Sequence, residues 1–167
     1  MASLYDHIGT TYRTSRSADP TIVATLASML QLDSASMYLD LACGTGNYTR
    51  ALAAHAGTWH GVDASAVMLA QASASSSLAA WHKADASNLP FPDNSFDGAI
   101  CTLAIHHFQD LHRPFREVRR TMKSGRFVLF TGLAEQMRNY WLCHYFPEMM
   151  RRSIARMPTL NAVQSSL

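Results

Sequence analysis

The sequence predicts an α/β fold, in which a doubly wound and mostly parallel sheet carries helices on both faces. Short apolar runs alternate along the chain with stretches of helical character, and only short connections separate them. This alternation is typical of parallel sheets, whose strands are joined through helices. Of the 167 residues 48% are apolar and 16% are charged, a composition that excludes intrinsic disorder and suits one packed domain.

The first predicted elements are a helix at residues 20–30 and a strand at residues 37–41. Asp19 can cap the helix by accepting hydrogen bonds from its free amide groups, and Pro20 stands where a missing N–H costs nothing. Apolar residues then recur every four positions, which places them on one face of the helix. The strand ends in a glycine-containing turn, and residues 47–55 are expected to form the next helix.

The remaining elements repeat this order. Ser65 is expected to begin one helix and Asp110 to cap another, and the last residues of the chain are helical in character. Right-handed crossovers bring the carboxyl ends of parallel strands to one edge of the sheet, where sheets of this kind bind ligands. The further strands are predicted at residues 59–63, 79–84, 96–102 and 127–130.

Charge, hydropathy and cysteine content exclude several classes of protein. The net charge of +2 is too small for the basic surface of a nucleic-acid binder. No stretch of about 18 apolar residues is present to span a membrane, and the first residues lack the pattern of a signal peptide, so a cytoplasmic protein is expected. Cys43, Cys101 and Cys143 are widely spaced and fit neither a disulfide framework nor a zinc site, and no metal site is predicted.

A turn containing Gly44 and Gly46 joins the first strand to its helix, and acidic residues surround this turn. Asp63 ends the next strand, where a carboxylate can accept hydrogen bonds from ribose hydroxyls. Dinucleotide sites place a third glycine three positions after the second, but Thr49 stands there. Asp40 leads into the turn, and its carboxylate would repel a pyrophosphate and attract the cationic amino and sulfonium groups of S-adenosylmethionine. The residues therefore favour S-adenosylmethionine over NAD.

Further motifs follow the glycine turn at consistent spacing. Together the motifs are Tyr38-Leu39-Asp40-Leu41-Ala42-Cys43-Gly44-Thr45-Gly46, then Gly61-Val62-Asp63-Ala64-Ser65 with Met68-Leu69, then residues 84–97, residues 102–108 and Glu117-Val118-Arg119-Arg120. This pattern resembles class I S-adenosylmethionine-dependent methyltransferases, and within them the type 11 branch that includes ubiquinone and menaquinone biosynthesis enzymes. The resemblance runs from about Tyr5 to Phe130. It implies a Rossmann-like fold and a bacterial enzyme that moves a methyl group to a small-molecule acceptor by in-line displacement, with S-adenosylhomocysteine as the product.

The resemblance also implies a cofactor site with a methionine part, a ribose part and an adenine part. A backbone segment closes over the sulfonium end, and the N-terminal region covers the site. The implied residues are Asp40, Ala42, Gly44 and Gly46 for the methionine part, Asp63 for the ribose, Ala64, Met68, Asp85 and Ala86 around the adenine, Leu103 over the sulfonium, and Tyr12 and Arg16 as the cover.

The sequence departs from the family pattern in three places. Ala42 stands where the family most often has a glycine, and residues 123–125 (Lys-Ser-Gly) replace a longer Pro-Gly-Gly turn, which we interpret as structural. After the fifth strand no counterpart of the final β-hairpin is expected. We therefore interpret residues 1–33 as a helical lid, residues 34–132 as the cofactor-binding core and residues 133–167 as a helical cover for the substrate, all within a single domain.

His106 is the candidate catalytic residue. It stands just beyond Leu103, where a neutral imidazole would take a proton from an acceptor hydroxyl or polarise it. Adjacent side chains on a helix point about 100° apart, so His106 and His107 do not form one metal clamp. His107 is expected to pack beneath the loop or to face solvent.

The sequence leaves several alternatives open. The chain could be a truncated or non-catalytic domain that binds S-adenosylmethionine or S-adenosylhomocysteine without turnover. An RNA methyltransferase is disfavoured by the weak positive charge, and an NAD-binding domain by Asp40 and Thr49. Either a monomer or a homodimer is compatible with the sequence.

Overall fold

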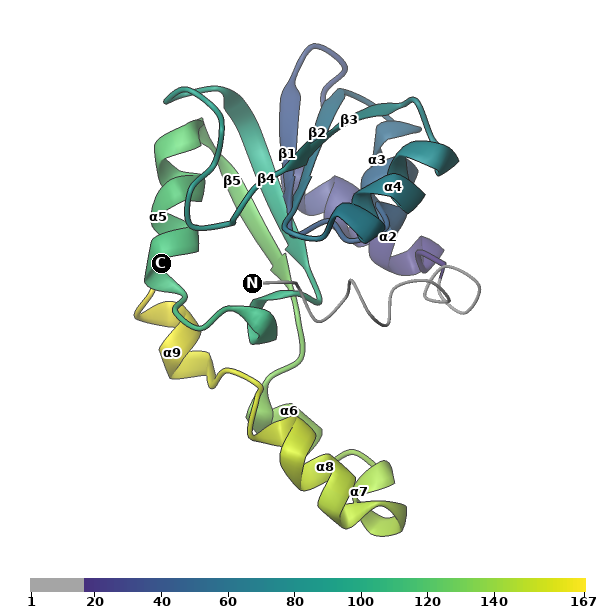
Figure 1. The fold of residues 1–167 in the computed structure, drawn as a ribbon, viewed down its shortest axis with the longest axis vertical. Coiled ribbons are helices and arrows are strands. Elements are labelled where there is room, and N and C mark those ends of the chain that lie inside the picture. The colour runs from purple at the N-terminus through teal and green to yellow at the C-terminus, as the bar shows by residue number, and fades with distance from the viewer. Residues whose placement is uncertain (1–16) are drawn as a thin grey trace.

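The computed structural model describes residues 17–167 and contains a five-stranded sheet with strand order β3-β2-β1-β4-β5 (Figure 1). Every pair of neighbouring strands is parallel. The predicted α/β fold is therefore confirmed, with a sheet that is parallel throughout. The strand order reverses between β1 and β4, so the carboxyl ends of these two central strands form the switch point where such sheets bind ligands.

The helices and strands follow the predicted order closely. The strands are β1 (Met37–Leu41), β2 (Thr58–Asp63), β3 (Ala79–Lys83), β4 (Phe96–Thr102) and β5 (Met122–Phe130). The helices are α2 (Pro20–Leu30), α3 (Asn47–Ala53), α4 (Ala66–Ser75), the short 3-10 helix η2 (Ile105–His107), α5 (His112–Thr121), α6 (Ala134–Met137), α7 (Leu142–Tyr145), α8 (Pro147–Ile154) and α9 (Leu160–Gln164).

Two of the predicted helix starts are confirmed by their caps. The third differs, because α5 begins after Leu111 without a side-chain cap, and the predicted cap Asp110 instead accepts the His112 N–H at 2.9 Å. The Asp19 carboxylate accepts hydrogen bonds from the backbone N–H groups of Thr21 at 2.8 Å and Ile22 at 3.2 Å. Ser65 caps α4 by accepting a hydrogen bond from the Met68 N–H at 3.3 Å. Each cap satisfies amide groups that have no partner within the helix itself.

Apolar side chains fill the space on both faces of the sheet. Tyr38 lies on the face covered by α2 and α3, where its ring stacks on Trp59 with the ring centres 5.0 Å apart. Leu39, the next residue of β1, is fully buried on the opposite face, which α5 covers. Phe96 of β4 belongs to the same apolar cluster as Leu39. This alternation along β1 follows from the twofold repeat of a strand, and it makes the sheet the middle layer of three (Figure 1).

The fifth strand begins earlier than the sequence predicts. Residues 123–125 were expected to form a turn, but β5 starts at Met122, directly after α5, and includes them. The pairing of β5 with β4 shifts its register between Phe96 and Gly98, which accommodates the extra residues of β5. Asp97 of β4 holds them in place, since its carboxylate accepts hydrogen bonds from Lys123 Nζ and from the Met37 N–H, both at 2.9 Å. The hydrogen bond from Met37 and then the one from Lys123 lower the pKa of Asp97. Because the neighbouring strand decides this geometry, local sequence does not reveal it.

The described residues after Phe130 form only helices and connecting turns. In Figure 1, α6, α7 and α8 stand away from the sheet, whereas α9 returns to the side of α5. Val163 of α9 is buried in the same apolar cluster as Phe115 of α5. The return is also held by a backbone hydrogen bond from the Ala134 N–H to the Pro158 carbonyl, at 3.1 Å.

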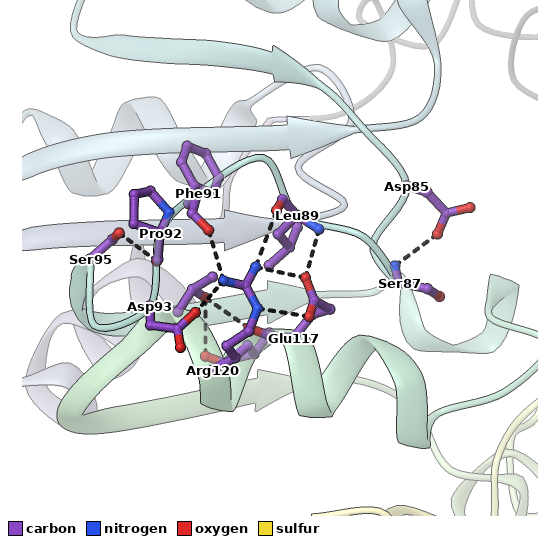
Figure 2. A network of polar contacts seen from close by, with 11 residues as sticks. Asp85, Ser87, Leu89, Phe91, Pro92, Asp93, Ser95, Glu117 and Arg120 are labelled. Carbon is purple, nitrogen blue, oxygen red and sulfur yellow. Dashed lines mark hydrogen bonds and ion pairs between the residues drawn. The ribbon is translucent and has the colours of Figure 1, made fainter.

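Arg120 of α5 fastens the long crossover from β3 to β4 (Figure 2). Its guanidinium donates to both carboxylate oxygens of Glu117 at 2.9 Å, to the carbonyls of Leu89 at 3.2 Å and Phe91 at 2.9 Å, and to Asp93 at 2.7 Å. Glu117 in turn accepts the Leu89 N–H at 2.9 Å. One side chain therefore satisfies two carbonyls of a segment that has no regular secondary structure of its own.

We expect Arg120→Met to lower the free energy of unfolding by about 1–2 kcal/mol, because two carbonyls and two carboxylates lose the hydrogen bonds of the guanidinium at a partly exposed site. Arg119→Met is the matched control, since Arg119 is the adjacent and exposed arginine of the same helix and should change stability by less than about 0.5 kcal/mol. Denaturant unfolding of both variants measures the difference. Equal losses would show that the network does not stabilise the crossover.

Candidate functional site

A cleft of about 1110 Å³ opens at the carboxyl edge of the sheet. The turns after β1, β2, β3 and β4 form its walls, together with the segment that leads into α5. Its position is the one expected from the switch point between β1 and β4. Among the cofactor-binding residues predicted from the sequence, those that line it are Ala42, Gly44, Asp63, Ala64, Met68, Asp85, Ala86 and Leu103.

The turn after β1 has three residues with positive φ: Ala42 at 56°, Gly44 at 57° and Gly46 at 70°. The two glycines adopt this left-handed conformation at little cost, whereas Ala42 carries a Cβ that disfavours it. A Cβ added to Gly44 would meet no atom within 4 Å, so open space lies beside this glycine. A Cβ added to Gly46 would overlap the indole of Trp81 from β3. Gly44 thus serves the cleft, and Gly46 serves the packing of the turn on the sheet.

Asp63 connects the turns that follow β1 and β2. One of its carboxylate oxygens accepts the Gly44 N–H and the other accepts the Ser65 N–H, both at 2.8 Å. The Cys43 N–H also donates to the Val62 carbonyl at 2.9 Å, which continues the sheet pairing into the turn. The carboxylate that the sequence assigns to ribose therefore also holds the backbone of the glycine turn.

Asp40 lies beneath the glycine turn and is almost completely buried. Thr49 Oγ1 donates a hydrogen bond to Asp40 Oδ2 at 2.6 Å, while Oδ1 has no hydrogen-bond partner among the described residues. The pKa of Asp40 is raised to about 7. Burial is the main cause, the hydrogen bond from Thr49 opposes it, and the charge of Asp63 adds to it. Asp40 therefore changes its charge near neutral pH, and an additional donor or cation beside Oδ1 would favour the ionised form.

Thr49 is a site residue whose role the sequence did not reveal. It attracted notice only because a dinucleotide site would have a glycine there. In the structure it is fully buried on α3 and fixes the orientation of the Asp40 carboxylate. The signal in the sequence was a threonine on the first turn of the helix that follows the strand carrying Asp40. From this position a side chain can reach back to the end of the strand.

Asp85 lies two residues beyond the end of β3, and its carboxylate is exposed to the cleft and to solvent. Its Oδ1 accepts the Ser87 N–H at 2.8 Å, and a backbone hydrogen bond from the Asn88 N–H to the Asp85 carbonyl, at 2.9 Å, closes the turn. The ends of β1, β2 and β3 thus each carry a carboxylate, and these three acidic residues follow one edge of the sheet.

Of the two histidines, the residues that line the cleft include His107 and do not include His106, and the catalytic role of His106 stays a prediction. The two residues lie on η2, and successive side chains of a 3-10 helix point about 120° apart. Burial lowers the pKa of His106 to about 4, with smaller effects from His107 and Arg156, and burial and Arg156 also lower the pKa of His107. Both imidazoles are therefore neutral at pH 7.

Leu103 sits at the end of β4 with φ of 53°, and its N–H donates to the Phe130 carbonyl at 2.7 Å. This strained turn exposes its side chain at the cleft. Asp40 and Gly46 lie behind the residues that form the cleft surface, and the proposed cover residues Tyr12 and Arg16 lie outside the described residues.

The thiols of Cys43 and Cys101 are buried. Burial is the main factor that raises the pKa of Cys43 and Cys101 well above the usual range of a thiol, and the charges of Asp40 and Asp63 add to it. Within residues 17–167 no group of three or more His, Cys, Asp and Glu side chains could hold a metal ion. No helix in this described part is long and apolar enough to cross a membrane.

Residues 39–130 match the family described as "Methyltransferase domain". The curated relatives include the uncharacterized methyltransferase YcgJ of Bacillus subtilis, 37% identical over 104 residues, and the demethylmenaquinone methyltransferase of Desulfitobacterium hafniense, 32% identical over 126 residues. The matched regions cover 59% and 67% of this chain, respectively. They cover only 41% and 49% of the two relatives, so the chain spans less than half of their length.

Solved structures show the same architecture. The crystal structure of an Anabaena variabilis protein described as a methyltransferase from an antibiotic biosynthesis pathway is 34% identical, with a TM-score of 0.81. The comparison covers 90% of this chain and 62% of the Anabaena chain. The structure of YcgJ is 27% identical with a TM-score of 0.73, and the comparison covers 89% of this chain and 66% of YcgJ.

The two glycines of the turn should respond differently to alanine. We expect Gly44→Ala to cost about 1 kcal/mol of unfolding free energy, since only backbone strain is added, and Gly46→Ala to cost roughly 2–4 kcal/mol, since the Cβ also meets Trp81. Gly132→Ala is the control, because a Cβ there meets only ordinary contacts at 3.9 Å. Denaturant unfolding of the three variants measures these costs, and a greater loss for Gly44→Ala would contradict the assignment.

Asp40 should make stability depend on pH. The folded pKa of about 7 lies above the ordinary value of 3.8, so the folded state binds the proton more tightly. Its contribution to stability is full below about pH 4 and is lost as the pH rises through 7, a total of about 4 kcal/mol. We expect Asp40→Asn, which cannot ionise, to gain stability relative to the wild type over this range. Parallel stability profiles from pH 4 to pH 8 would refute the burial of an ionisable group here.

Proposed function

The chain belongs to the class I S-adenosylmethionine-dependent methyltransferase family, and on that premise we propose that its cleft binds S-adenosylmethionine and transfers the methyl group to a small-molecule acceptor. The observation that carries the proposal is the set of three carboxylates at consecutive strand ends, one of which has a buried oxygen with no hydrogen-bond partner within residues 17–167. An unpartnered buried oxygen costs free energy unless a ligand or water satisfies it.

The residues present fit such a ligand. The amino group of its methionine part is a cation that would favour the ionised form of Asp40, and the open space beside Gly44 lets a ligand approach the backbone. The Asp63 carboxylate lines the cleft at the end of β2, where its oxygens accept the Gly44 and Ser65 N–H groups, and we assign the ribose hydroxyls to this carboxylate. We assign Ala64, Met68, Asp85 and Ala86 to the adenine end, because all of them line the part of the cleft formed by β2 and β3.

When bound, S-adenosylmethionine supplies a methyl group on a cationic sulfur, which is already a strong electrophile. The protein then has to hold an acceptor in line with this methyl group and exclude water from it. We assign the backbone at Leu103 to the sulfonium end, since its strained turn lies at the end of β4 beside the glycine turn. No metal or thiol is needed for this reaction.

We assign the acceptor to the part of the cleft that lies beyond Leu103, where His107 lines the wall. We propose His107 as the wall residue beside the acceptor and His106 as a group that packs against it, since their ring centres are 3.9 Å apart and only His107 lines the cleft. A neutral imidazole can accept a proton from an acceptor hydroxyl. The Desulfitobacterium relative acts on demethylmenaquinone, by its name, and this supports a small organic acceptor.

Titration calorimetry with S-adenosylhomocysteine tests the cofactor assignment, with NAD as the control ligand. We expect only S-adenosylhomocysteine to bind, and we expect Asp63→Ala to weaken it roughly 10- to 100-fold through the lost charged hydrogen bonds. Asp97→Ala is the matched control, because Asp97 also accepts two hydrogen bonds but lies at the amino ends of the strands. Unchanged affinity in Asp63→Ala would remove the ribose assignment, and preferential binding of NAD would overturn the cofactor itself.

Catalysis is tested separately from binding. The protein is incubated with isotopically labelled S-adenosylmethionine and fractionated small-molecule extracts, and labelled products are identified by mass spectrometry. Labelled small molecules are the expected result. Tight binding of S-adenosylhomocysteine together with no transfer to any fraction would favour a domain that binds the cofactor without turnover.

A further inference from the structure

The three short helices α6, α7 and α8 form an arm that stands away from the sheet (Figure 1). Met150 of α8 is buried, and so is Ala134 at the base of the arm, so the arm has a small interior of its own. Its outer surface is unusual for a polar environment, because large aromatic side chains are exposed on it. The proposed function uses none of them.

The exposed aromatic residues form a continuous patch on α7 and the turns that flank it. The ring of Trp141 lies 5.8 Å from that of Tyr140 and 5.9 Å from that of Tyr145, centre to centre. Trp141 is 57% exposed and Tyr145 is 72% exposed, and Phe146 and Met149 extend the patch toward α8. Tryptophan and tyrosine combine an apolar ring with a polar group, which suits them to the boundary between water and hydrocarbon.

The arm region also carries the net positive charge of the chain. Residues 133–167 contain four arginines and two glutamates, a net charge of +2, whereas residues 1–132 contain ten basic and ten acidic residues. Arg151 and Arg152 are about three-quarters exposed and share Glu148 as their ion-pair partner at 2.9 Å. Arg152 and Arg156 border the same shallow hollow as Met149, so the basic surface adjoins the aromatic patch.

We propose that this arm docks on an anionic lipid surface, with the aromatic patch inserted at the level of the headgroups and the arginines against their negative charges. Exposed aromatic residues beside a basic surface are the features that bind a helical segment to the plane of a bilayer. A second copy of the chain fits less well, because a symmetric contact of this patch would bring Arg151, Arg152 and Arg156 toward their own copies. A nucleic acid fits less well, because four arginines supply few phosphate contacts.

Such docking would place the cleft close to the lipid. Arg156 follows α8 at the base of the arm, and its charge lowers the pKa values of His106 and His107 on η2. The base of the arm therefore lies near η2, which contributes His107 to the cleft wall. The docking itself does not depend on the reaction proposed above and is tested without it.

Co-sedimentation of the full chain with vesicles provides the test, at 30% phosphatidylserine in phosphatidylcholine and in pure phosphatidylcholine. We expect clear binding to the anionic vesicles and binding at least about tenfold weaker to the neutral ones. Trp141→Ser with Tyr145→Ser should reduce the partition coefficient at least about tenfold, and so should Arg151→Gln with Arg152→Gln and Arg156→Gln. Leu78→Ser is the control for exposed apolar area, because Leu78 is 56% exposed on the body of the protein. Arg116→Gln with Arg119→Gln is the control for charge.

Tryptophan fluorescence reports the docked residue directly. Of the three tryptophans, Trp59 is buried and Trp81 is half-buried, so a blue shift on addition of vesicles must come mainly from Trp141. Trp141→Phe should abolish the shift and retain most of the binding, and circular dichroism shows whether each variant is folded. Equal binding to both kinds of vesicle, or loss of binding in the control variants, would overturn the proposal. So would absence of vesicle binding, whether the chain instead self-associates in sedimentation velocity or binds an RNA oligonucleotide.

Discussion

The carboxylate of Asp63 is the interaction on which the shape of the cleft depends. Its two oxygens hold the Gly44 N–H and the Ser65 N–H, which belong to turns on two different strands. These turns precede α3 and α4, so the same contact also fixes how both helices leave the sheet. A backbone with positive φ at three positions would otherwise be free to relax, and the anchored amide prevents this. The same carboxylate therefore holds the two turns and is the group to which we assign the ribose.

Asp40, unlike Asp63, lowers the stability of the folded state when it is ionised. A buried carboxyl group with one oxygen that no described residue satisfies destabilises the folded state in its ionised form, and Thr49 compensates only in part. An apolar residue would serve the core better. The arrangement becomes favourable once a cation or a donor satisfies the free oxygen, so the energetic cost of this site points to a ligand. The neighbouring Cys43 and Cys101, whose thiols stay protonated, add no charge to oppose it.

Much of this structure follows from local signals in the sequence. The features that local signals do not predict share one cause. The strand at residues 96–102 and the cap at Asp19 follow from hydrophobic pattern and capping chemistry, and the structure confirms both. The start of β5 depends on Asp97 in another strand, and the pairing of Thr49 with Asp40 depends on how α3 packs on β1. Contacts between elements decide these features, and no single segment of sequence encodes them.

Asp85 shows how distant packing supports a site residue. It follows β3, a short strand at the edge of the sheet, and its own turn is held by few hydrogen bonds. The chain beyond it is fastened four residues later, where Leu89 is bound through both its N–H and its carbonyl by Glu117 and Arg120 of α5. The strand on one side and this clamp on the other leave the turn little freedom. An exposed carboxylate at a sheet edge thereby acquires a defined position in the cleft, and the anchored crossover, rather than the burial of Asp85 itself, provides it.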